Sequence, residues 1–195
     1  MNEDTRGADI HPWFKSRFLY LIVTILAMIL LAPHLQGFAG ISLLLDIFFS
    51  IIFIAGIYAL SHKKYHLFLA IVLAAPMILS LWAKYILVGS YIIIVGRIFG
   101  LLFFGFAIFQ IVQFVYRAED ITKDVIFAAI VVYLLLAEMW AFTYSLLELL
   151  QPGSFNFGSS KIQEADLIFV YYSFVTLTTL GYGDITPLTE KATSL

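Results

Sequence analysis

Residues 171–184 read YYSFVTLTTLGYGD, an apolar and aromatic run that passes directly into a segment of threonine and glycine. The apolar part runs from Asp166 to Leu177, and about a dozen residues are too few to cross a bilayer. The loop before it, residues 151–164, contains Pro, Gly, Ser and Asn, which favour irregular backbone. This region therefore predicts a re-entrant helix, with Asp166 as its N-cap, followed by a non-helical segment.

The rest of the chain has the composition of a protein embedded in lipid. Of its 195 residues, 62% are hydrophobic and 12% charged, whereas soluble domains are about half apolar and a quarter charged. Apolar runs of about 20 residues, the length that spans a bilayer, precede the loop. We predict an all-α integral membrane protein with five transmembrane helices, at Phe18–Leu35, Gly40–Leu60, Leu67–Trp82, Tyr91–Tyr116 and Val125–Leu150.

The distribution of Lys and Arg predicts the orientation of these helices, because basic residues near span ends stay on the cytoplasmic side. A cytoplasmic N-terminal segment, residues 1–17, leaves seven such residues inside and three outside. The segment after Leu150 is then extracellular or periplasmic. The inner set is Arg6, Lys15, Arg17, Lys63, Lys64, Arg117 and Lys123, and the outer set is Lys84, Lys161 and Lys191.

The glycine spacing in residues 179–183 suits a row of cation-binding carbonyl groups. Moving a monovalent cation from water into low dielectric costs on the order of 20 kcal/mol in idealised terms, so closely spaced oxygens must replace its hydration shell. Backbone carbonyls achieve this only if all point to one axis, which needs backbone angles forbidden to most L-residues at alternate positions. Gly181 and Gly183 provide those angles because they lack a Cβ.

Residues 171–184 resemble the pore helix and signature selectivity filter of tetrameric potassium channels. The resemblance implies a four-helix transmembrane region at 18–116 and a pore domain at 125–195. Within that domain it implies an outer helix at 125–150, a pore helix at 166–178 and an extended filter at 179–183. It further implies passive K⁺ conduction in the cell membrane by a homotetramer. The K⁺ ligands would be the carbonyls of Thr179, Leu180, Gly181 and Tyr182, with the Thr179 hydroxyl at the inner end.

The same resemblance implies supporting roles for residues around the filter. Thr178 and Asp184 flank it, and Tyr171 and Tyr172 occupy the pore-helix pair where Trp is common in the family. We predict that the Tyr171 hydroxyl hydrogen-bonds to Asp184 and braces the filter, as the family's corresponding aromatic residue does. Leu180 replaces the Val of many members, which leaves its carbonyl unaffected.

Arg97 is the single basic residue within the fourth predicted span. Voltage sensing needs several such charges at three-residue spacing, so strong voltage dependence is not predicted. Charged residues inside a membrane usually pair with one another. We therefore predict a structural ion pair between Arg97 and either Asp46 in the second span or Glu138 in the fifth.

Several alternatives remain open. Family members continue into an inner helix that lines the pore, whereas this sequence stops eleven residues after Asp184; we expect a longer protein, and the alternative is a non-conducting regulatory or assembly subunit. A transporter with four filter-like loops in one chain is disfavoured by the single loop, and an ordinary surface turn beside a buried helix is less consistent with the context. No catalytic motif, nucleic-acid-binding basic run or cysteine is present, so we expect no enzyme activity and, apart from lipid and permeant K⁺, no cofactor.

Overall fold

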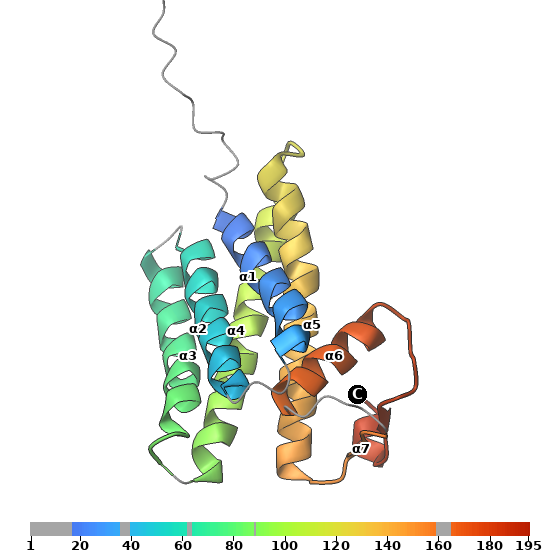
Figure 1. The fold of residues 1–195 in the computed structure, drawn as a ribbon. Coiled ribbons are helices and arrows are strands. Elements are labelled where there is room, and N and C mark those ends of the chain that lie inside the picture. The colour runs from blue at the N-terminus through green and yellow to red at the C-terminus, as the bar shows by residue number, and fades with distance from the viewer. Residues whose placement is uncertain (1–16, 36–39, 62–63, 88, 159–164) are drawn as a thin grey trace, which may run out of the picture.

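The computed structural model describes residues 17–35, 40–61, 64–87, 89–158 and 165–195. The predicted N-terminal segment 1–17 lies outside the described residues except for Arg17. The helices run alternately up and down in a bundle, and α6 lies across the lower half of α5 (Figure 1). The elements are α1 (Arg17–Leu31), η2 (Ala32–Leu35), α2 (Ile41–Ala59), α3 (Lys64–Ala83), α4 (Ser90–Tyr116), α5 (Lys123–Leu150), β1 (Phe155–Asn156), α6 (Ala165–Leu177), β2 (Thr186–Pro187) and α7 (Glu190–Thr193).

Four of the described helices, α2 to α5, are long and apolar enough to cross a membrane. The first predicted span is instead divided into α1, which has 15 residues, and the 3-10 helix η2. The break has a local cause, because Pro33 has no N–H to donate and disfavours helical geometry at the residue before it. The chain is thus a mostly helical multi-pass membrane protein, and a fifth span stays a prediction.

Aromatic side chains fill the interior between α2, α4 and α5. The Phe53 ring lies 4.9 Å from that of Phe103 and 5.2 Å from that of Phe104, and Phe104 contacts Phe142 at 5.2 Å. All of these side chains are fully buried. Gly100 makes the close approach of α4 to α5 possible, because a Cβ there would lie 2.7 Å from the Phe142 ring. The resulting contact holds α4 against α5, the helix on which α6 also packs.

The region after α5 folds back onto that helix. The Ser173 hydroxyl on α6 donates to the Ala137 carbonyl of α5 at 2.6 Å. β1 and β2 pair in antiparallel fashion, with Phe155 opposite Pro187 and Asn156 opposite Thr186. The loop that follows α5 is therefore joined to the chain just beyond the predicted filter. The predicted short helix at 166–178 is found as α6, one residue earlier at each end.

Candidate functional site

The predicted filter begins inside the cap of α6. The Thr179 N–H donates to the Thr176 carbonyl at 2.9 Å, and the Leu180 N–H donates to the Val175 carbonyl at 3.1 Å. These two bonds define a Schellman motif, which satisfies carbonyls that a helix end would otherwise leave free. The Gly181 N–H also reaches the Val175 carbonyl, at 3.3 Å. The end of α6 thus determines where the segment 179–183 starts and in which direction it leaves.

The backbone of this segment alternates between two conformations. Thr179, Gly181 and Gly183 have φ of 59°, 54° and 75°, whereas the intervening Leu180 and Tyr182 are not in the positive-φ region. The left-handed geometry predicted for the two glycines is confirmed. The segment is neither a continuation of the helix nor a regular strand.

Thr179 is the member of this series that sequence reasoning did not predict. Positive φ is a genuine outlier for a β-branched residue, and it persists only where the surroundings impose it. Here the constraint is the Schellman motif, whose left-handed position is usually glycine but falls on Thr179 in this chain. A strained backbone residue of this kind, here the first residue of the predicted filter, is typical of a functional site.

Asp184 directly follows the segment and is held by two hydrogen bonds. The Tyr171 hydroxyl donates to Asp184 Oδ2 at 2.7 Å, and the Ile185 N–H donates to Oδ1 at 3.1 Å. The predicted hydrogen bond between Tyr171 and Asp184 is therefore present, while its bracing role stays a prediction. Gly158, with φ of 49°, packs on the other side, where a Cβ would lie 2.7 Å from the Asp184 carbonyl oxygen.

Tyr172, the second predicted support, belongs to an aromatic cluster between α5, β1 and α6. Its ring lies 4.9 Å from Tyr144 and 5.6 Å from Phe155. Phe155 also contacts Phe169, at 5.5 Å. Phe169 and Tyr172 are three residues apart, a spacing that puts both on one helix face. The sequence indicates that face, but it does not reveal that a loop residue, Phe155, packs between α5 and α6.

Glu148 fixes the loop that carries β1, and the sequence analysis missed it. Its carboxylate accepts hydrogen bonds from the N–H groups of Gly153 at 2.7 Å, Ser154 at 2.9 Å and Phe155 at 3.2 Å. A signal was available, since a carboxylate in the last turn of a helix opposes the helix dipole and needs partners. Glu148 lies in the last turn of α5, two residues before its final residue, Leu150.

The predicted partners of Arg97 are wrong. Arg97 pairs with the carboxylate of Asp166 on α6, and its guanidinium lies 4.7 Å from the centre of the Phe142 ring. The predicted N-cap role of Asp166 is also wrong, because the residue lies within α6, in its first turn. Glu138 is fully buried and has no hydrogen-bond partner within the described part of the chain.

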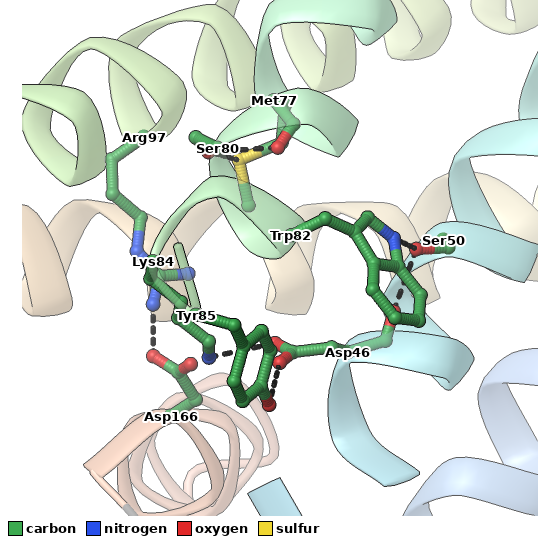
Figure 2. A network of polar contacts seen from close by, with 9 residues as sticks. All are labelled: Asp46, Ser50, Met77, Ser80, Trp82, Lys84, Tyr85, Arg97 and Asp166. Carbon is green, nitrogen blue, oxygen red and sulfur yellow. Dashed lines mark hydrogen bonds and ion pairs between the residues drawn. The ribbon is translucent and has the colours of Figure 1, made fainter. Parts of the chain in front are cut away.

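Asp46 has other partners, at the same end of the bundle as Arg97 (Figure 2). It accepts hydrogen bonds from Lys84 Nζ at 2.9 Å and from Tyr85 Oη at 2.6 Å, as Figure 2 shows. Both donors follow the end of α3 directly, so α2 and α3 satisfy Asp46 between them. Arg97 pairs instead with Asp166, which lies 69 residues further along the chain.

The surface of the filter segment is open in a single chain. All residues from Thr178 to Gly183 are exposed, and Leu180 and Tyr182 retain 58% and 66% of their accessible surface. Among the described residues, no group of three or more His, Asp or Glu side chains could hold a metal ion. The backbone oxygens of residues 179–182 stay the predicted ligands for a cation.

Four bilayer-length helices, followed by this capped, glycine-containing segment, have the make-up of a multi-pass membrane protein. Residues 121–193, which include α5, α6 and the filter segment, match the family model described as an ion channel. The match covers 73 of the 195 residues, and this part of the chain is similar to an ion channel domain, in keeping with the resemblance to potassium channels. Neither a curated protein nor a solved structure matches the chain.

Proposed function

We propose that the chain is a subunit of a potassium-selective channel that conducts K⁺ passively. The observation that carries this proposal is the alternation of φ along residues 179–183 in a segment that starts from the cap of α6. In the proposed filter, the carbonyls of Thr179, Leu180, Gly181 and Tyr182 replace the hydration shell of K⁺, together with the Thr179 hydroxyl. Potassium is the permeant ion, and the proposed mechanism needs no cofactor.

The position of α6 supports the same proposal. The last turn of a helix carries a partial negative charge, and this turn stands directly behind the first filter residue. A cation near the end of α6 is therefore favoured over an anion. Preference for K⁺ over Na⁺ would come from the number and the spacing of the carbonyl ligands.

A single filter segment cannot surround an ion, so we propose four copies around a central axis, as a homotetramer. The exposed Leu180 and Tyr182 side chains support this arrangement, because neighbouring copies would cover them. The proposed location is the plasma membrane, with the filter on its outer side. Its support is the placement of Arg17, Lys64 and Lys123 at helix starts at one end of the bundle, opposite the pore region (Figure 1).

The test is an ion flux assay on the full-length protein in liposomes. With a K⁺ gradient we expect K⁺ flux that greatly exceeds Na⁺ flux under the same driving force. Equal permeation of the two ions would refute the selectivity. Assembly without any flux would instead favour a regulatory or assembly subunit.

A further inference from the structure

The ion pair of Arg97 and Asp166 joins the four-helix region to the helix that carries the filter. Arg97 lies on α4 and its side chain is 7% exposed; Asp166 lies in the first turn of α6 and its side chain is 21% exposed. Figure 2 shows the guanidinium directed at the Asp166 carboxylate. Among the described residues, it is the only ion pair that involves α6.

The Arg97 side of this contact is firmly placed. The guanidinium lies over the Phe142 ring of α5, a cation–π arrangement that is stronger when it is shielded from water. The adjacent Gly96 leaves no room for a Cβ against the Ser80 side chain of α3, which holds α4 close at this level. Because α4 is packed against both α3 and α5 here, Arg97 presents a fixed charge to α6.

Asp166 lies at the start of α6, and the proposed filter follows the other end of that helix. α6 has 13 residues, a length of about 20 Å as a rigid α-helix. Its first turn carries Asp166, and its last turn forms the Schellman motif that contains Thr179 and Leu180. A tilt of α6 at its first turn therefore moves the start of the filter segment.

We propose that Arg97 and Asp166 are positioning residues for the selectivity filter and that this ion pair transmits changes in α4 to it. The inference rests on the proposed potassium-channel function. Removal of either partner leaves a poorly hydrated charge unpaired and releases the first turn of α6 from α4. The carbonyl ligands would then lose the spacing on which discrimination between K⁺ and Na⁺ depends.

The pair of Asp46 and Lys84 is a matched control within the same chain. It also joins an acidic and a basic side chain, at 2.9 Å, and Asp46 is 1% exposed. It connects α2 with the residue after α3, and neither partner is hydrogen-bonded to α6 (Figure 2). A purely structural role for buried ion pairs predicts similar effects from breaking either of them.

The experiment compares full-length proteins reconstituted in liposomes: the wild type, Arg97→Gln, Asp166→Asn, the double variant and the control Asp46→Asn. Two quantities are measured, the K⁺/Na⁺ permeability ratio and the thermal midpoint of the assembled protein. We expect each single variant of the pair to lower the ratio by about tenfold or more. The double variant should be no worse than the poorer single variant, because both remove one contact. Asp46→Asn should lower the thermal midpoint and leave the ratio within about twofold of wild type.

Three results would overturn the inference while the proposed function stands: a K⁺-selective wild type with unchanged single variants, additive effects in the double variant, or an equal loss of selectivity in Asp46→Asn. A wild type without preference for K⁺ would refute the proposed function and this inference together. If Arg97→Gln fails to assemble, Arg97→Lys takes its place in the comparison. Lysine keeps the positive charge but lacks the planar guanidinium group with its several N–H donors. A partial loss of selectivity is then expected, and an unchanged ratio counts against the pair.

Discussion

Replacing Glu148 by Ala should destabilise the loop that is joined to the filter region. The Glu148 carboxylate accepts hydrogen bonds from the backbone N–H groups of Gly153, Ser154 and Phe155. Gly153 is exposed, whereas Ser154 and Phe155 are buried. Water replaces the lost partner at Gly153. Each of the two buried donors left without an acceptor costs about 1–3 kcal/mol, which gives about 2–6 kcal/mol in total for Glu148→Ala.

The assay is reversible unfolding in mixed micelles, followed by circular dichroism, which gives the free energy of unfolding of each variant. Glu148→Gln keeps one oxygen acceptor and should lose about half as much stability as the alanine variant. Glu119→Ala, an exposed residue in the loop between α4 and α5, is the control and should stay within about 0.5 kcal/mol of wild type. If Glu148→Ala is as stable as this control, the three hydrogen bonds contribute nothing to the free energy of unfolding.

Three further substitutions test the surroundings of the filter. Tyr171→Phe removes the hydrogen bond to Asp184, worth about 1.5–3 kcal/mol to a charged acceptor, and should speed the decay of K⁺ flux and lower selectivity; unaltered selectivity and inactivation would dispose of the bracing role. Gly183→Ala forces a Cβ onto a residue with φ of 75°, at a cost of about 1–2 kcal/mol, and should reduce K⁺ flux, whereas Gly105→Ala in α4 meets no atom and should not. Ser173→Ala loses a buried hydroxyl donor to α5 and should lower the unfolding free energy by about 0.5–1.5 kcal/mol; a chemical denaturation curve identical to wild type would contradict this.

The features that sequence reasoning predicted depend on the local chain or on a short motif. The apolar lengths of α2 to α5 indicate bilayer-length helices because the requirement is set by bilayer thickness. Gly181 and Gly183 were predicted to be left-handed, and they are, because only glycine adopts that region at little cost. Thr179 could not be predicted in the same way, since its conformation is imposed by the cap of α6 against its own preference.

The pairing of Arg97 shows what a sequence does not contain. Buried charges need partners, so the existence of an ion pair was a sound prediction. Which partner is chosen depends on how helices are oriented around their axes and on where a loop returns. Asp46 was already satisfied by Lys84, a near neighbour of α2 in space, while a long loop brought Asp166 beside α4.

The exposed surface of Leu180 and Tyr182 has a consequence for inheritance. If four copies share one conduction path, as proposed, no single copy forms a whole filter. One defective copy then impairs every tetramer that contains it. A cell that makes normal and defective chains in equal amounts would then hold only about one fully normal tetramer in sixteen. Damaging substitutions in this segment should therefore behave as dominant, whereas substitutions that only prevent a chain from folding should be recessive.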